Sequence, residues 1–202
     1  MLDTQIIKHN SNYKKIRRYL QVFLCFFIIF IGIHQIISSK EHVNNVLIVN
    51  LEGPITPPMS QYVMRVLKEA NQIKAEAVFI KMDTPGGLDT SMREIVKGIL
   101  DSDVPVINYV IPGGRAASAG IFIAMASHLS VMAPGSSIGA ASPVSSQGQE
   151  IEGTLKDKVT NDAAEYIRDL ANNRKRNGEW AADSAVRLAK SLGAQEALEK
   201  NV

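Results

Sequence analysis

The chain has 202 residues, enough for one domain of ordinary size and a short additional segment. Hydrophobic residues make up 46% of the sequence and charged residues 21%, which argues against intrinsic disorder. Lys and Arg number 22 against 20 Asp and Glu, so the formal net charge is +2 and a broad basic surface for nucleic acid is not expected.

The small positive charge is concentrated at the N-terminus. Residues 1–18 contain five basic side chains and one acidic side chain, and the apolar run LQVFLCFFIIFIGI follows at 20–33. Basic residues before an apolar run are typical of a chain whose N-terminus stays in the cytoplasm while the rest is exported. We therefore predict a basic cytoplasmic leader over 1–18, a signal anchor or signal peptide over 19–38 and a linker over 39–44. The following IISSK is a poor cleavage site, which favours the retained anchor.

Cysteine and histidine are too few to build a metal site or a disulfide framework. The single cysteine, Cys25, lies within the apolar run, and no His, Asp and Glu residues are grouped with metal-ligand spacing. We predict no metal and no other cofactor.

Beyond residue 44, short apolar runs alternate with segments of helical periodicity. Strands are predicted over 45–51, 77–82, 104–111 and 129–132, and helices from Pro57 to about residue 73, after Gly87 to residue 100, and over 116–125, 156–173, 179–191 and 194–200. This alternation predicts one α/β domain over 45–202 with a mostly parallel sheet covered by helices. Residues 140–154 are rich in Ser, Gly and Gln, which predicts a surface loop or mobile flap.

Two glycine-bearing loops should meet at one cleft, because both follow predicted strands of a parallel sheet. One contains Gly86 and Gly87, and the other runs from Pro112 to Ser118. Ser118 lies in the small-residue sequence GGRAASAG at a predicted helix start, where unpaired backbone N–H groups could stabilise an oxyanion. Ser118 is therefore the candidate nucleophile, although a serine beside alanines at a helix start is more often a helix cap or a packing choice.

Five short motifs follow one another in this part of the chain: MDTPGG at 82–87, AASAG at 116–120, APGSSIGA at 133–140, EWA at 179–181 and AQEAL at 194–198. Together they resemble the NfeD family of membrane-bound, ClpP-class serine proteases. The resemblance implies a ClpP/crotonase-like fold of stacked ββα units and a homo-oligomer. It also implies that Ser118 is the nucleophile, with an oxyanion hole from the backbone N–H of Ala119 and of the Gly86–Gly87 loop.

The resemblance also bears on the identity of the general base. Soluble ClpP peptidases use a histidine in the region that corresponds to residues 139–144, where this chain has none, and His128 lies only ten residues after Ser118. NfeD-type proteases use a lysine, and the matching position is Lys158, with Lys156 as an open alternative. A lysine can accept a proton only as the neutral amine, which desolvation favours.

The resemblance thus implies a membrane-associated serine endopeptidase with a Ser–Lys dyad, its catalytic domain on the extracytoplasmic side. Its expected substrates are hydrophobic peptide segments of membrane proteins such as stomatin-like partners. One alternative is a non-catalytic, membrane-tethered scaffold that binds a stomatin-like protein, and another is a crotonase-type acyl-CoA enzyme. The second predicts a cytoplasmic location, against which the export signal argues. Family members continue past Val202 with a further strand, so the domain is expected to be truncated at its C-terminal end.

Overall fold

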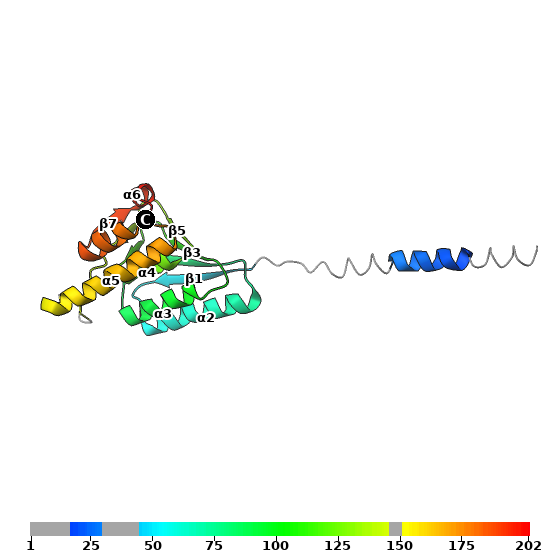
Figure 1. The fold of residues 1–202 in the computed structure, drawn as a ribbon, viewed down its shortest axis with the longest axis horizontal. Helices are drawn as coiled ribbons and strands as arrows, with labels where there is room; N and C mark the ends of the chain where they lie inside the picture. Colours follow the sequence, from blue (N-terminus) through cyan, green and yellow to red (C-terminus); the bar gives the residue numbers. More distant parts are fainter. Residues whose placement is uncertain (1–16, 30–44, 146–150) are drawn as a thin grey trace, which may run out of the picture. The chain divides into compact units, whose positions relative to one another are not determined.

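The computed structural model describes residues 17–29, 45–145 and 151–202, which fall into two units, Met1–Val43 and Asn44–Val202. In the first unit, residues 17–29 form a helix (Figure 1). None of the helices in the described ranges is both long enough and apolar enough to span a bilayer. The rest of the predicted leader and anchor, residues 1–16 and 30–38, lies outside the described residues, as do the linker residues 39–44.

A four-stranded parallel sheet forms the centre of the second unit (Figure 1). Its strands, in spatial order, are β1 (Val46–Glu52), β2 (Ala77–Asp83), β3 (Val106–Val110) and β5 (Leu129–Met132). All four are strands predicted from the sequence, and the mixed α/β class with a mostly parallel sheet is confirmed.

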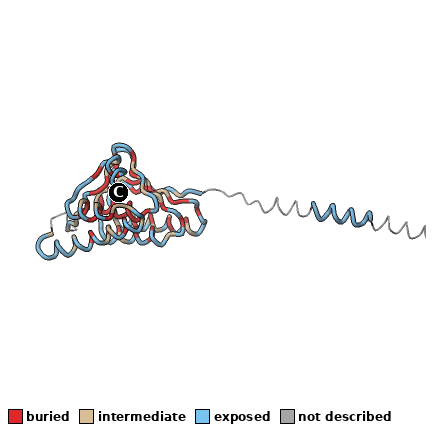
Figure 2. The backbone as a smooth tube through the Cα atoms, turned by 45° about the horizontal axis from the view of Figure 1, so that its top comes forward, coloured by how far each residue is buried: buried red, intermediate tan, exposed pale blue. Residues whose placement is uncertain are grey.

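Helices cover one face of this sheet, with α2 (Pro57–Ile73) against β1 and β2 and α4 (Ala119–Ala126) against β5. The other helices are α3 (Asp89–Leu100), α5 (Gly153–Asn173), the π-helix η1 (Trp180–Arg187) and α6 (Ala194–Glu199). Helix α3 lies against α2 and α4, and α5 contacts α4 and η1. Figure 2 shows that the buried backbone runs through the middle of this unit, where strands and helices meet.

A second, three-stranded sheet was not expected from the sequence. It consists of β4 (Arg115–Ala117) and β6 (Ser137–Gly139), which are parallel, and β7 (Ser191–Gly193), which is antiparallel to β6. The helix predicted over 116–125 is therefore wrong at its start, because residues 116 and 117 belong to β4 and α4 begins at Ala119. Strands of three residues are too short to produce a period-two pattern, and tertiary pairing decides their conformation.

The other predicted boundaries shift by smaller amounts. Helix α5 begins at Gly153, so the predicted loop is shorter than 140–154, and its residues 146–150 lie outside the described part. The predicted helix over 179–191 ends earlier, at Arg187, because the chain enters β7 at Ser191.

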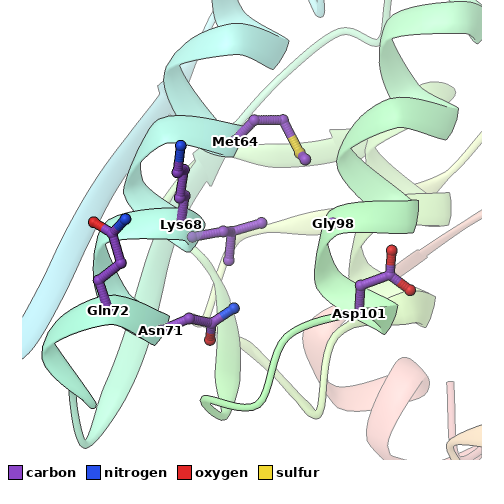
Figure 3. Close-up of a pocket in the computed structure, with 7 residues that line it drawn as sticks. Met64, Lys68, Asn71, Gln72, Gly98 and Asp101 are labelled. Atoms are coloured by element: carbon purple, nitrogen blue, oxygen red, sulfur yellow. The ribbon is translucent and has the colours of Figure 1, made fainter.

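Helices α2 and α3 approach closely at Gly98. A Cβ atom added at Gly98 would lie 2.4 Å from Sδ of Met64 and 3.0 Å from Cδ1 of Leu67, so the missing side chain permits this contact. Figure 3 shows the small pocket beside it, about 390 Å³ in volume, between the last turns of the two helices. None of the predicted site residues lines this pocket.

The second face of the four-stranded sheet carries an apolar row that runs across all four strands. The strand register aligns Ile48, Phe79, Ile107 and Leu129. Ile48 is 58% exposed and Leu129 is 52% exposed, while Phe79 and Ile107 are half-buried. This row is an unusual amount of apolar surface to leave in water.

Candidate active site

Ser118 is held in an uncommon backbone conformation between β4 and α4. Its φ is 50° and its ψ is −115°, a region that non-glycine residues rarely occupy. The N–H of Ser118 donates to the carbonyl oxygen of Gly139 at 3.0 Å, and its own carbonyl accepts from the N–H of Ile121 at 3.2 Å. These bonds, together with β4, fix a conformation that costs on the order of 1–3 kcal/mol, and such strain is concentrated at functional sites.

The glycine loop after β2 lies directly against Ser118. A Cβ atom added at Gly86 would lie 2.5 Å from Cβ of Ser118 and 2.9 Å from its Oγ. Gly86 also has a φ of +107°, which side-chain-bearing residues seldom adopt. Thr84, which is fully buried, pairs with Ala116 in a parallel bridge and thereby aligns the glycine loop with β4. Gly86 is thus the residue whose missing side chain makes room for Ser118.

Two backbone N–H groups beside Ser118 remain available to a ligand. The N–H of Gly86 donates to Oγ1 of Thr84 at 3.1 Å, so it is already engaged. Within the described ranges, the N–H groups of Gly87 and Ala119 have no acceptor. Both residues line the same cleft as Ser118. The sequence predicted an oxyanion donor in the Gly86–Gly87 loop. Gly87, and not Gly86, has the N–H that is free to bind an oxyanion.

The cleft that contains Ser118 has a volume of about 740 Å³ and mostly apolar walls. Its larger apolar lining residues are Ile55, Leu88, Met92, Phe122, Pro143 and Val144. Among the described residues that line it, Asp89 is the only ionisable one. A cleft of this size and character suits an extended apolar segment better than a charged one.

Helix α4 presents its N-terminus to the cleft, and two arginines bind its other end. All eight of its residues are buried. Nε of Arg174 donates to the carbonyl of Ala126 at 2.8 Å, and Nη1 of Arg176 donates to the carbonyls of Met125 at 2.8 Å and Ser127 at 3.0 Å. Burial, followed by repulsion from Arg174, lowers the pKa of Arg176 to about 10. Cations here satisfy carbonyls that the helix leaves unpaired and complement its dipole.

His128 has a structural position at the start of β5. Its ring Nδ1 accepts a hydrogen bond from the backbone N–H of Val106 at 3.1 Å, and the backbone N–H of His128 donates to the carbonyl of Val106 at 2.9 Å. Burial is the main cause that lowers the pKa of His128, and Arg174 and Arg176 lower it further. These two bonds join the start of β5 to the start of β3, and His128 does not line the cleft of Ser118.

The two candidate lysines lie apart from the assembled serine site. Lys156 and Lys158 belong to the first two turns of α5, and both side chains are exposed. Neither lines the cleft, although Ala163 of the same helix does. The structure thus brings Ser118, Gly86, Gly87 and Ala119 together and leaves Lys158 on the adjacent helix. In the part of the chain that the structure describes, no group of three or more His, Cys, Asp or Glu residues could hold a metal ion.

Sequence reasoning missed two sets of residues at this site. Arg174 and Arg176 fall in the basic run NNRKRNG, which has the composition of a solvated helix end. Thr84 and Gly139 position Ser118 through backbone pairing, for which the only sequence signal was their place in the glycine-containing motifs.

Comparison with known proteins identifies the class to which this α/β domain belongs. Residues 45–198 match the family model described as NfeD1b, N-terminal domain, so the chain belongs to the NfeD1b N-terminal domain family. The resemblance to NfeD proteins predicted from the five motifs is confirmed.

Two curated relatives are similar over part of their length. Membrane-bound protease PH1510 of Pyrococcus horikoshii is 42% identical over 163 residues, which cover 79% of this chain and 36% of that protein. Membrane protein NfeD1b of Bacillus subtilis is 32% identical over 112 residues, which cover 55% of this chain and 25% of that protein. The chain therefore spans about a third or less of the length of these relatives.

Solved structures of one such protein share the fold. A lysine-to-alanine mutant of the 1510-N membrane-bound stomatin-specific protease, in complex with a substrate peptide, superposes with a TM-score of 0.73 at 41% identity. The match covers 79% of this chain and 73% of that one. A serine-to-alanine mutant of the same protease gives a TM-score of 0.72 at 41% identity, covering 79% and 77% of the two chains.

Replacing Gly86 with Ala should displace Ser118, and Gly135→Ala provides a matched control. Both glycines have positive φ, +107° and +80°, but nothing lies within 4 Å of a Cβ added at Gly135. Both variants should lose about 1–2 kcal/mol of stability because alanine is placed at a positive φ, and Gly86→Ala should lose roughly 1–3 kcal/mol more from the clash. Urea denaturation measures the difference. Equal losses in the two variants would contradict the close approach of Gly86 to Ser118.

Proposed function

We propose that this chain is a membrane-associated serine endopeptidase in which Ser118 is the nucleophile and Lys158 is the general base. The observation that carries the proposal is the convergence of a conformationally strained serine and two unpaired N–H groups, those of Gly87 and Ala119, on one apolar cleft. Acyl transfer needs this combination, because the nucleophile and the oxyanion donors must flank the same carbonyl group.

The proposed reaction has two steps. Oγ of Ser118 attacks the carbonyl carbon of the scissile peptide while the neutral amine of Lys158 takes the hydroxyl proton. The N–H groups of Gly87 and Ala119 stabilise the tetrahedral oxyanion, and the C–N bond breaks as Lys158 returns the proton to the leaving amine. Water then attacks the acyl ester on Ser118 while Lys158 accepts a proton from it, and the C–O bond to Oγ breaks as Lys158 returns that proton to Oγ of Ser118, which releases the acid product and restores the enzyme.

The choice of Lys158 over Lys156 is supported by spacing. In the solved protease, the serine and lysine that were replaced by alanine lie 41 positions apart. Here Lys158 follows Ser118 by 40 positions and Lys156 by 38. Lys158 therefore requires a length difference of a single residue between the two proteins, whereas Lys156 requires three.

The proposed substrates are hydrophobic segments of membrane proteins, with stomatin-like proteins as the partner class. Support comes from the apolar walls of the cleft and from the name of the solved protease, which describes it as stomatin-specific. Because Asp89 is the ionisable residue at the cleft, acidic residues near the scissile bond should be disfavoured.

Three variants of the full chain test the proposed peptidase. Ser118→Ala and Lys158→Ala should each reduce cleavage of a hydrophobic peptide at least about 1000-fold, because neither group has a substitute in the proposed reaction. Lys156→Ala, the matched control from the same turns of α5, should cleave at nearly the wild-type rate. Unfolding curves exclude loss of structure. Full activity of Lys158→Ala with loss in Lys156→Ala would reverse the assignment of the base.

The second candidate is the non-catalytic scaffold, which is favoured by the exposed position of Lys158 outside the cleft. A serine-directed fluorophosphonate probe separates the two functions. Labelling that is lost in Ser118→Ala supports the peptidase. A folded chain that binds a stomatin-like protein yet resists the probe is a scaffold.

We also propose that residues 19–38 anchor the chain in a membrane, with the domain that begins at residue 45 on the extracytoplasmic side. The basic residues of segment 1–18 and the membrane-protein names of both curated relatives support this topology. Protease added to intact cells should digest the domain, and only after permeabilisation should it reach the first residues. Protection of the domain in intact cells would contradict the orientation.

Homo-oligomerisation is the remaining proposal, and the apolar row on the second face of the sheet supports it. Replacing Ile48 and Leu129, its two most exposed members, with Lys should dissociate the oligomer in sedimentation velocity experiments, because charges would then have to be buried. An unchanged sedimentation coefficient would mean that subunits meet elsewhere or that the chain is a monomer.

A further inference from the structure

Arg93 joins the cleft wall formed by α3 to helix α5. Its Nε donates to Oδ2 of Asp89 at 2.9 Å, and its Nη2 donates to Oδ2 of Asp162, on α5, at 2.5 Å. The guanidinium carbon also lies 4.3 Å from the ring centroid of Tyr166, and that ring stacks on Phe122 with centroids 5.9 Å apart. Since Asp89 and Phe122 line the cleft, this cluster connects the cleft to the helix that carries Lys158.

Lys158, Asp162 and Tyr166 are spaced four residues apart and therefore share one side of α5, the side that Arg93 contacts. Residues at this spacing on a helix are close enough for a lysine to pair with a carboxylate. In the structure, however, the carboxylate of Asp162 binds Arg93, and the described residues show no ion pair between Asp162 and Lys158.

We propose that Arg93 is a positioning residue for the general base: it binds Asp162 and so prevents that carboxylate from pairing with Lys158 and stabilising its protonated form. The inference rests on the proposed role of Lys158. A lysine that must accept a proton from Ser118 has to be available as the neutral amine, and an adjacent carboxylate opposes this.

Asp162 is the carboxylate best placed to interfere. At three or four residues from Lys158, the neighbours on α5 are Thr154, Leu155, Asn161 and Asp162, so Asp162 alone is acidic. Asp157 is adjacent in sequence and faces a different direction. The other charged residues on α5, before it and on the helices joined to it are Glu152, Lys156, Glu165, Arg168 and Asp169, then Asp89, Arg93, Glu94 and Lys97 on α3, and Asp183 and Arg187 on η1. Asp89 is bound by Arg93 and Asp183 by Arg187, and α4 contributes no ionisable side chain.

Competitive acetylation of the full chain over a pH series, read by mass spectrometry, measures the neutral fraction of each lysine without requiring catalysis. In Arg93→Met, the labelling midpoint of Lys158 should move up by about 0.3 pH unit, a roughly twofold loss of neutral amine, as expected for an exposed pair at this spacing. In Arg93→Met/Asp162→Asn the midpoint should return to the wild-type value, and in Asp162→Asn alone it should fall. Lys156 is the internal control and should not move.

Two results would overturn the inference: an unchanged Lys158 midpoint in Arg93→Met, or an elevated midpoint that persists in the double variant. If Arg93→Met does not fold, Arg93→Lys serves instead. It keeps a charge near Asp162 but cannot hold both carboxylates, so it should give a smaller upward shift.

The midpoint of the acidic limb in the pH profile of peptide cleavage should shift as the labelling midpoint does: upward in Arg93→Met, downward in Asp162→Asn, and not at all in the double variant. A uniform loss of kcat/KM with an unmoved limb would indicate a purely structural role for Arg93. If Ser118→Ala still cleaves peptide, the proposed function fails, whereas the labelling result still decides whether Arg93 controls the amine of Lys158.

Discussion

The candidate site depends on one close approach, that of the Gly86 backbone to the side chain of Ser118. The approach is possible because Thr84 pairs with β4, which places the loop after β2 beside the turn that follows β4. Any side chain in place of Gly86 would put its Cβ atom 2.5 Å from Cβ of Ser118, which is too short for two carbon atoms that are not bonded. The same pairing places the N–H of Gly87 and the N–H of Ala119 in one cleft, so the proposed nucleophile and the proposed oxyanion donors arise from a single backbone arrangement.

Helix α4 connects the turn that contains Ser118 to the buried core of the domain. Its N-terminus is the turn that contains Ser118, and its C-terminal carbonyls are bound by Arg174 and Arg176 from the segment after α5. Because the helix is entirely buried, these carbonyls would have no water to bind if the arginines were absent. The C-terminal third of the domain therefore helps to hold α4 in place. Lys158 is the only predicted site residue that lies in this third.

The four strands of the parallel sheet could be predicted because each is a short apolar run followed by a segment that contains proline and glycine. The two glycine loops could be predicted because parallel strands carry their loops at one edge. The three short strands β4, β6 and β7 could not, since pairing between distant segments rather than local preference sets their conformation. The small residues around Ser118 made it a candidate nucleophile, whereas nothing in the sequence predicted its positive φ. Lys158 came from family resemblance alone, because an exposed lysine early in a helix looks like any solvated lysine.

The two halves of the proposed site thus differ in how they are specified. The proposed oxyanion donors are backbone N–H groups whose positions are fixed by glycines and strand pairing. The residues that fix them lie within short motifs, so the sequence itself indicates them. The proposed base is a side chain on α5, and in our proposal its surroundings are set by Arg93, which lies 65 positions earlier in the chain. A motif cannot record such a pairing, because Arg93 and Asp162 are joined only by the folded structure. We therefore expect that substitutions far from both motifs can alter the proposed base while Ser118 and the proposed oxyanion donors remain in place.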